Sequence, residues 1–319
     1  MINSRAPLIV KEAKRNEWLN VFLIASPTIG IIVRMIIDKY KLEDNNILLV
    51  SIRSTNLDIF ENTKIDLIQK KYDGYLEKIF FLSPKGIRIQ NHIKKKNKKF
   101  LVYASWAYRE VNWLLKSNSC VGHIYIDEGQ GTYMNYIPFS YKKQNLFEKF
   151  LKNWKNRINV GDGSGDFYRD DAHAHIGMFE NCYPKIIENK YILDDFENLK
   201  KYYKPKLLGV KTIGLTCSAS RLSFNQWGNM LKILAMEMGN KGIIKPHPSF
   251  TTSEIVYSKF KNVFKNVMGD KIKLCPPDVF IELEMLYENK KLIGPQSSLK
   301  RFSDHFKSEY KQVNLYNKL

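Results

Sequence analysis

The segment VGHIYIDEG, residues 121–129, shows how this chain is built. The apolar run Val121 to Ile126 has the length and composition of a buried strand, and it ends in Asp127, Glu128 and Gly129. In open α/β sheets, ligands bind beyond the carboxyl ends of the strands. The segment therefore predicts a strand that presents two carboxylates at the functional edge of a sheet.

Two later segments repeat this arrangement. Apolar residues at 243–244 lead into Lys245-Pro246-His247-Pro248, and those at 292–293 lead into Gly294-Pro295-Gln296-Ser297-Ser298. Flanking prolines hold an imidazole such as that of His247 at a fixed angle, and serines that open a helix can donate hydrogen bonds to a phosphate. Acidic, imidazole and hydroxyl groups at three strand ends favour a transferase that acts on a phosphate leaving group.

In the rest of the chain, predicted strands and helices alternate. We expect strands at 21–25, 46–52, 78–82, 100–104, 121–126, 212–216, 242–244, 272–275 and 291–294, and helices at 86–96, 108–116, 146–157, 224–238, 254–267, 279–290 and 298–306. Such alternation predicts an α/β fold with doubly wound, mostly parallel sheets.

The chain of 319 residues is long enough for two domains. We place an N-terminal, acceptor-binding domain at 1–150, an interdomain connection at 151–210 and a C-terminal, nucleotide-binding domain at 211–319. The apolar stretch 21–37 contains a proline, a glycine and an arginine, so we interpret it as a strand, a turn and a helix and not as a membrane span.

Composition excludes several classes of site. The cysteines have no CxxC spacing, which argues against a zinc or disulfide framework and fits free, buried thiols. Asp170, Asp171, His173 and His175 could ligate a metal, but we favour a mobile or interdomain loop there and expect no metal site. Neither GxGxxG nor GxxxxGK[ST] occurs, so no dinucleotide or P-loop site is indicated.

The formal net charge of +19 includes a lysine run at 94–99. Such an excess attracts anionic partners, namely a membrane surface, nucleic acid or an acidic glycan. A basic, non-enzymatic protein that binds nucleic acid or another polyanion is therefore an alternative of a different class. No recognised nucleic-acid-binding motif accompanies the charge, so we expect no nucleic acid partner.

The ordered set Asp127-Glu128-Gly129, His247-Pro248 and Ser297-Ser298 resembles the D/E-D/E-G, HP and S-S/T motifs of bacterial sialyltransferases. The segment Ile126 to Tyr133 looks most like glycosyltransferase family 52, whose members act in capsule and lipooligosaccharide synthesis. The resemblance implies a GT-B fold, with two doubly wound Rossmann-like domains facing a central cleft. It also implies inverting, metal-independent transfer of sialic acid from CMP-sialic acid to a hydroxyl of a cell-surface glycan.

Residue roles follow from the same resemblance. Glu128 would deprotonate the acceptor with Asp127 in support, although the reverse assignment stays open. His247 would protonate or hydrogen-bond the departing CMP phosphate, and Ser297 and Ser298 would hold that phosphate.

The remaining residues complete the expected site. Lys245 and Pro248 would contribute to donor binding, and Glu282 would bind the ribose, with Glu284 as the second choice. From the residues themselves, Gly129 and Thr132, in the loop that runs on through 131 and 133, are candidates for the acceptor pocket. No cofactor is expected besides the donor substrate.

The expected partners are a CMP-activated sugar, a glycan or glycolipid acceptor and the inner leaflet of the membrane, which the basic surface would attract. The expected location is the cytoplasm, with peripheral attachment to the inner face of the membrane. An apolar helix face at 147–154 could serve a homodimer. Transfer of another CMP-activated sugar, Kdo or a related nonulosonic acid, is the nearest alternative, and polyol-phosphate transfer from CDP-glycerol is a more distant one.

Overall fold

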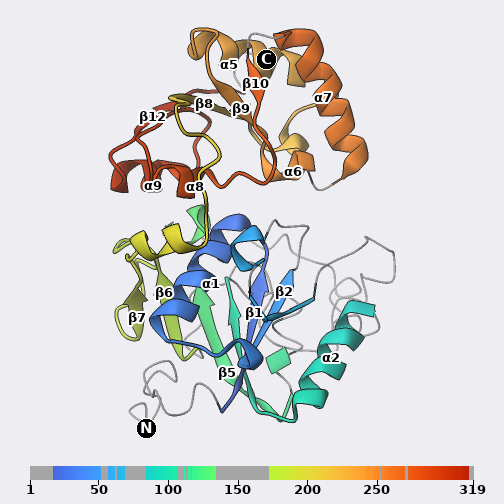
Figure 1. The fold of residues 1–319 in the computed structure, drawn as a ribbon, viewed down its shortest axis with the longest axis vertical. Helices are drawn as coiled ribbons and strands as arrows, with labels where there is room; N and C mark the ends of the chain where they lie inside the picture. Colours follow the sequence, from blue (N-terminus) through green and yellow to red (C-terminus); the bar gives the residue numbers. More distant parts are fainter. Residues whose placement is uncertain are drawn as a thin grey trace, which may run out of the picture. The chain divides into compact units, whose positions relative to one another are not determined.

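The computed structural model describes residues 17–51, 57–61, 63–68, 84–105, 111, 114–115, 117–133, 172–251, 253–269 and 272–315. The chain divides into two compact units, Met1–Asp195 and Phe196–Leu319, and each is built on its own parallel sheet (Figure 1). The predicted strand at 78–82 lies outside the described residues, as does the predicted helix at 146–157 with its possible dimer face. The predicted helix at 108–116 lies mostly outside them.

The first unit contains a seven-stranded sheet in the order β3-β2-β1-β4-β5-β6-β7, with every neighbouring pair parallel. Its strands are β1 (Leu19–Ile24), β2 (Ile47–Ser51), β3 (Asp66–Ile68), β4 (Phe100–Ala104), β5 (Cys120–Ile126), β6 (Ala174–Gly177) and β7 (Lys190–Ile192). The helices whose bounds the structure describes in this unit are α1 (Pro27–Lys39) and α2 (Pro84–Lys96), with 3-10 turns at Asp44–Asn46, Asp58–Phe60 and Gln130–Tyr133.

The stretch 21–37 forms a strand, a turn and a helix, as predicted. All of β1 is buried, and Ser26 caps α1 by accepting a hydrogen bond from the N–H of Ile29. Pro27 stands at the first helical position, where its missing N–H costs nothing. No helix within the described part of the chain is long and apolar enough to cross a membrane.

The second unit contains a five-stranded parallel sheet in the order β10-β9-β8-β11-β12. Its strands are β8 (Thr212–Leu215), β9 (Ile243–Lys245), β10 (Lys273–Leu274), β11 (Lys291–Gly294) and β12 (Glu309–Gln312). The helices are α5 (Phe224–Glu237), α6 (Pro248–Thr251), α7 (Glu254–Met268), α8 (Ile281–Glu284) and α9 (Leu299–His305), with 3-10 turns at Glu197–Lys201 and Ala219–Arg221.

Both sheets confirm the predicted doubly wound α/β class. In each sheet the first strand lies between the second and the fourth strand of that unit, so the strand order reverses at β1/β4 and at β8/β11. Such switch points open a crevice at the carboxyl edge of a sheet, where ligands bind.

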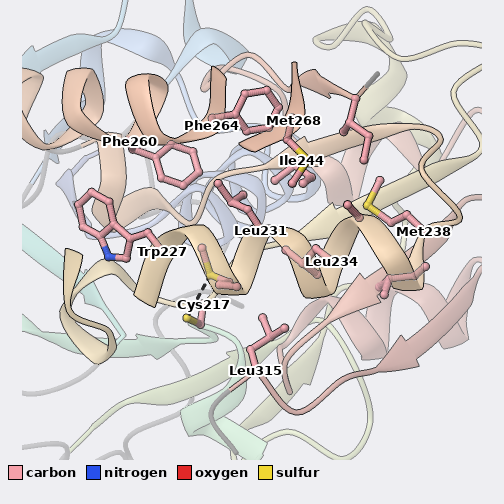
Figure 2. Packing of buried hydrophobic residues seen from close by; sticks show 14 of the residues in the cluster. Cys217, Trp227, Leu231, Leu234, Met238, Ile244, Phe260, Phe264, Met268 and Leu315 are labelled. Atoms are coloured by element: carbon pink, nitrogen blue, oxygen red, sulfur yellow. Dashed lines mark hydrogen bonds between the residues drawn. The ribbon is translucent and has the colours of Figure 1, made fainter. Parts of the chain in front are cut away.

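The core of the second unit lies between its sheet and the pair α5 and α7 (Figure 2). Trp227 of α5 and Phe260 of α7 both pack against Phe250, with ring centroids 4.9 and 4.3 Å from the Phe250 ring. Phe250 belongs to the short helix α6 and is completely buried. Burial of one aromatic ring therefore anchors the loop that follows β9, with a stabilisation of about 1.5–3 kcal/mol.

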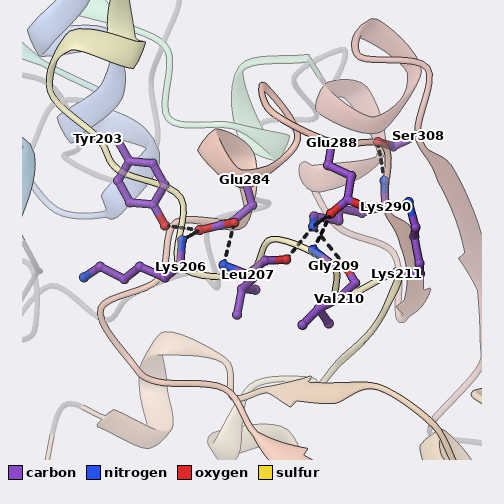
Figure 3. Close-up of polar contacts among 10 residues, drawn as sticks. All are labelled: Tyr203, Lys206, Leu207, Gly209, Val210, Lys211, Glu284, Glu288, Lys290 and Ser308. Carbon is purple, nitrogen blue, oxygen red and sulfur yellow. Dashed lines mark hydrogen bonds and ion pairs between the residues drawn. The ribbon is translucent and has the colours of Figure 1, made fainter.

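The sequence-based boundaries are wrong at 279–290, where the predicted helix shrinks to α8. The Glu284 carboxylate accepts hydrogen bonds from the Tyr203 hydroxyl at 2.5 Å and from the N–H groups of Lys206 and Leu207 at 2.7 and 3.0 Å (Figure 3). The buried ammonium of Lys290 donates to the Leu207 carbonyl at 2.7 Å. These contacts to the 203–207 segment take the place of further helical turns.

The first unit also extends beyond the predicted 1–150. Strands β6 and β7 belong to its sheet, although both lie within the 151–210 segment that the sequence suggested as a connection. Each has only three or four residues, too few for a sequence pattern to define a strand. Likewise β3 and β12, short and partly exposed, are absent from the expectations above.

At the β8/β11 switch point, Gly294 has no room for a side chain. A Cβ atom at this position would lie 2.6 Å from the Cβ and 2.8 Å from the carbonyl oxygen of Leu215. We therefore expect Gly294→Ala to lower the free energy of unfolding, measured in urea, by about 1–3 kcal/mol.

The matched control for that change is Gly228→Ala in α5. Its Cβ would meet the Val267 side chain at 3.6 Å, an ordinary contact, and alanine favours the helix. Stability should be unchanged or rise by up to about 1 kcal/mol. Equal losses in both variants would contradict the proposed close approach of β8 and β11.

Glu288 gives the second unit an acid-sensitive contact (Figure 3). Hydrogen bonds from Lys211 and Lys290 and from the N–H of Gly209 lower the pKa of Glu288 from 4.5 to about 2. Because the folded-state pKa is depressed, this stabilisation is complete above pH 4.5 and disappears as the pH falls toward 2. The stability difference between the wild type and Glu288→Gln should therefore shrink across this interval in acid titrations followed by circular dichroism. A constant difference would show that the carboxylate charge has no role.

Candidate active site

The carboxyl edge of the second sheet gathers the loops that follow β8, β9 and β11. Parallel pairing places Leu215 opposite Lys245 and Gly214 opposite Ile293, so the three strands end close together. The chain after these ends supplies Thr216, the Lys245–Pro248 motif and the Gly294–Ser298 motif. This edge of the second unit therefore contains two of the three motifs that the sequence identified.

His247 is held firmly although its side chain is exposed. Its N–H donates to the Thr216 hydroxyl oxygen at 2.7 Å, which ties the β9 loop to the end of β8. Pro248 begins α6, and the buried Phe250 fixes that helix to the core. The imidazole Nδ1 lies 2.9 Å from the hydroxyl oxygen of Ser249. Backbone and ring are therefore both constrained before any ligand binds.

Lys245 holds the neighbouring loop. Its ammonium donates to the carbonyls of Pro276 and Pro277 at 3.0 and 2.8 Å. Burial lowers the pKa of Lys245, while the nearby acidic groups, Glu282 among them, act in the opposite direction. The lysine thus connects the β9 end to the turn that leads into α8, and its charge lies near the Glu282 carboxylate.

The two glutamates of α8 have different surroundings. Glu284 is completely buried and accepts the three hydrogen bonds described above, so its carboxylate organises the 203–207 segment. Glu282 keeps 9% exposure and interacts electrostatically with Lys245. Of the two glutamates that could bind the ribose of the nucleotide, Glu282 is the one that lies near Lys245, a candidate for binding the sugar donor.

The serine pair opens α9 in an unexpected way. The Ser297 hydroxyl oxygen accepts a hydrogen bond from the N–H of Leu299 at 3.3 Å, whereas the side chain of Ser298 makes no capping hydrogen bond. Tyr310 contacts the Ser297 side chain and donates to the Pro295 carbonyl, which fixes the turn before the helix. Ser297 thus has a structural partner, and Ser298 is half-buried beside it.

In the first unit, Asp127 is an organising residue of its loop. It is completely buried, and it accepts hydrogen bonds from the N–H of Gly129 at 2.8 Å, from the hydroxyls of Thr132 and Tyr133, and from the N–H of Met178 at 3.4 Å. Burial raises the pKa of Asp127, and the four donors act against that rise. Its lone pairs are therefore engaged within the protein.

Glu128, the next residue, is only half-buried. The loop turns at Gly129, whose φ of 110° is strained for any residue with a side chain. Thr132 is completely buried, and its hydroxyl oxygen also lies 2.9 Å from the Gly129 carbonyl. In this loop Gly129 and Thr132 shape the backbone around Asp127, and their contact with an acceptor stays a prediction.

Within the described residues, no group of three histidine, cysteine, aspartate or glutamate side chains could hold a metal ion. The expectation of a mobile or interdomain loop at 173–175 was wrong, because Ala174 to Gly177 form β6 and His175 is buried. Asp170 and Asp171 lie outside the described residues. The four cysteines are free thiols; three are buried, whereas Cys120, which was expected to be buried, is only half-buried.

Several polar residues of these loops were not singled out from sequence. Thr216, Ser218 and Ser249 surround the His247 motif. The sequence did contain one indication, since Thr216 and Ser218 lie at or just after the end of a predicted strand. Hydroxyl residues are common after strands, so position alone does not distinguish them.

With this geometry in place, comparison with known proteins defines the fold. No family model matches the chain, and no curated protein does. Solved structures do match, and they have the GT-B fold of nucleotide-sugar glycosyltransferases and epimerases. The structure thus confirms an α/β fold of the GT-B type, with two Rossmann-like units.

The particular structures are distant in sequence. A UDP-N-acetylglucosamine 2-epimerase from Rickettsia bellii superposes with a TM-score of 0.54 at 12% identity. The match covers 93% of this chain and 79% of the epimerase chain. S. aureus MnaA, solved with UDP, has a TM-score of 0.53 at 13% identity, and the match covers 92% of this chain and 79% of MnaA. A sialyltransferase from Photobacterium damsela has a lower TM-score of 0.44 at 12% identity, and the match covers 88% of this chain and 70% of the sialyltransferase.

The contrast between Asp127 and Glu128 is testable. Each oxygen of Asp127 accepts one backbone N–H, from Gly129 or from Met178, so an amide nitrogen in Asp127→Asn would face a donor in either orientation. We expect a loss of about 1–3 kcal/mol in urea unfolding followed by circular dichroism.

The control is Glu128→Gln, at the half-buried neighbouring position. It should stay within about 0.5 kcal/mol of the wild type. If Glu128→Gln proved as destabilising as Asp127→Asn, the assignment of a structural carboxylate and a separate, more accessible one would fail.

Proposed function

We propose that this protein is an inverting, metal-independent glycosyltransferase that moves sialic acid from CMP-sialic acid to a hydroxyl of a cell-surface glycan. The observation that carries the proposal is the placement of His247 at the β8/β11 switch-point edge, fixed by Thr216 and beside Lys245. The motif resemblance to bacterial sialyltransferases supplies the sugar and the nucleotide. The fold adds support for a nucleotide-sugar donor in general.

The second unit would bind the donor. Ser297 and Ser298 would donate hydrogen bonds to the CMP phosphate, and Lys245 would lower the negative potential around it. Glu282 would accept hydrogen bonds from the ribose hydroxyls. Pro248 contributes by starting α6 directly after His247, which limits the positions open to the imidazole.

The first unit would supply the base. Asp127 accepts four hydrogen bonds within its loop, and the half-buried Glu128 follows it, so Glu128 is the better candidate to take the proton of the acceptor hydroxyl. Gly129 and Thr132 would position the acceptor through the shape of that loop. A well-placed base contributes about 10²–10⁴ in rate.

The bond changes are simple. The bond between the anomeric carbon and the phosphate oxygen breaks, and its electron pair stays on CMP, where His247 and the serines stabilise the charge. The acceptor oxygen bonds to the opposite face of the anomeric carbon, and its proton passes to Glu128. Attack from the opposite face inverts the configuration, and none of these roles calls on a metal.

The basic surface supports a membrane-proximal role. Lys94, Lys95 and Lys96 form the last turn of α2, and the chain carries an excess charge of +19. Such a surface would attract anionic glycolipid acceptors and the inner leaflet of the membrane, at about 1 kcal/mol per basic residue near the surface.

The decisive experiment measures CMP release from CMP-sialic acid by the purified protein with a metal chelator present, with and without glycan acceptors. Parallel reactions contain CMP-Kdo and, because UDP is bound in the S. aureus structure, UDP-N-acetylglucosamine. We expect release from CMP-sialic acid that persists in chelator and is faster with acceptor.

Variants assign the roles. His247→Ala should reduce turnover about 10²–10³-fold, and Glu128→Gln should reduce transfer about 10²–10⁴-fold while CMP binding by calorimetry stays near the wild-type value. His92→Ala, on α2 of the first unit, is the histidine control and should retain activity. Turnover of CMP-Kdo or the UDP-sugar in place of CMP-sialic acid would reassign the donor. Absence of CMP binding would end the sialyltransferase proposal.

A further inference from the structure

Ser249, the second residue of α6, contacts both the imidazole of His247 and the loop that follows β8. Its N–H lies 3.1 Å and its hydroxyl oxygen 2.9 Å from Nδ1 of His247. The same hydroxyl oxygen accepts the N–H of Ala219 at 2.8 Å and lies 3.2 Å from the Ser218 hydroxyl oxygen. One side chain therefore joins the imidazole to the loop that follows β8.

Hydrogen-bond chemistry determines the proton positions in this cluster. A backbone N–H can only donate, so Nδ1 of His247 accepts from Ser249 and carries no proton of its own. The neutral imidazole must then carry its proton on Nε2. Because Nδ1 carries no proton, the Ser249 hydroxyl is the donor in its 2.9 Å contact with Nδ1, while its oxygen accepts from the Ala219 N–H and the Ser218 hydroxyl.

We propose that Ser249 is a positioning residue that holds His247 as the Nε2–H tautomer and keeps its ring attached to the loop after β8. The consequence for catalysis rests on the function proposed above. His247 would then donate a hydrogen bond from Nε2 to the departing phosphate and would keep its proton. CMP would leave as the dianion, and the only proton transferred would be that of the acceptor hydroxyl.

Burial explains why this contact can be precise. Phe250, next to Ser249, is completely buried against Trp227 and Phe260, so the α6 backbone cannot follow a rotating imidazole. The Ser249 N–H and hydroxyl are thus fixed donors. Preorganised donors of this kind are the elements that make charge stabilisation effective in an active site.

The test uses the full-length protein labelled with ¹⁵N-histidine, without any ligand, with His247→Ala to assign the His247 signals. In the wild type, Nδ1 should resonate as a hydrogen-bonded acceptor and Nε2 as a protonated nitrogen. Ser249→Ala keeps the backbone N–H and therefore the Nε2–H tautomer, but it should shift the Nδ1 signal because the hydrogen bond from the hydroxyl is lost. Ser249→Thr should restore the wild-type signal. Ser253→Ala removes the N-cap of α7 nearby and should leave the His247 signals unchanged.

Kinetics with the donor complete the test. Loss of one hydrogen bond predicts that Ser249→Ala lowers kcat about tenfold, with a smaller change in KM and recovery in Ser249→Thr. A wild-type His247 with its proton on Nδ1, or identical His247 spectra in wild type and Ser249→Ala, would overturn the inference. If the spectra behave as expected and no donor is turned over, the proposed function fails while the assignment of Ser249 stands.

Discussion

Parallel pairing of β8 with β9 and β11 is the constraint on which the candidate site depends. It brings three loops, separated by dozens of residues in sequence, to one edge of the second sheet. Because β8 lies between the other two strands, this edge contains a switch point, the place where ligands bind in open α/β sheets. Gly294 permits this arrangement, since a side chain there would collide with the backbone of Leu215.

A common principle links two acidic pairs, Asp127 with Glu128 and Glu282 with Glu284. In each pair one carboxylate is completely buried and accepts backbone N–H groups: Asp127 in the first unit and Glu284 in the second. The other member, Glu128 or Glu282, retains some exposure. A buried carboxylate is stable only with such donors, so one acid of each pair organises the backbone around it.

The positive charge also serves more than one purpose. The buried Lys290 donates hydrogen bonds to two backbone carbonyls (Figure 3). Lys245 donates hydrogen bonds to two others. Within the lysine run of the first unit, Lys96 pairs with Asp66 at 3.0 Å and Lys98 contacts Asn46. Part of the excess charge therefore stabilises the fold, and only the remainder can attract an anionic partner.

The sequence by itself determined the α/β class, the strand-turn-helix at 21–37 and the positions of the three motifs, because apolar runs, caps and strand-end polar residues are local signals. It did not determine the short strands β6 and β7, or the end of α8 at Glu284, because these depend on pairing partners and hydrogen bonds from distant segments. The different burial of Asp127 and Glu128, and the contact between Ser249 and His247, were decided by tertiary structure. Burial and the positions of hydrogen-bond donors are established only when the chain has folded, so neighbouring carboxylates can then have different surroundings.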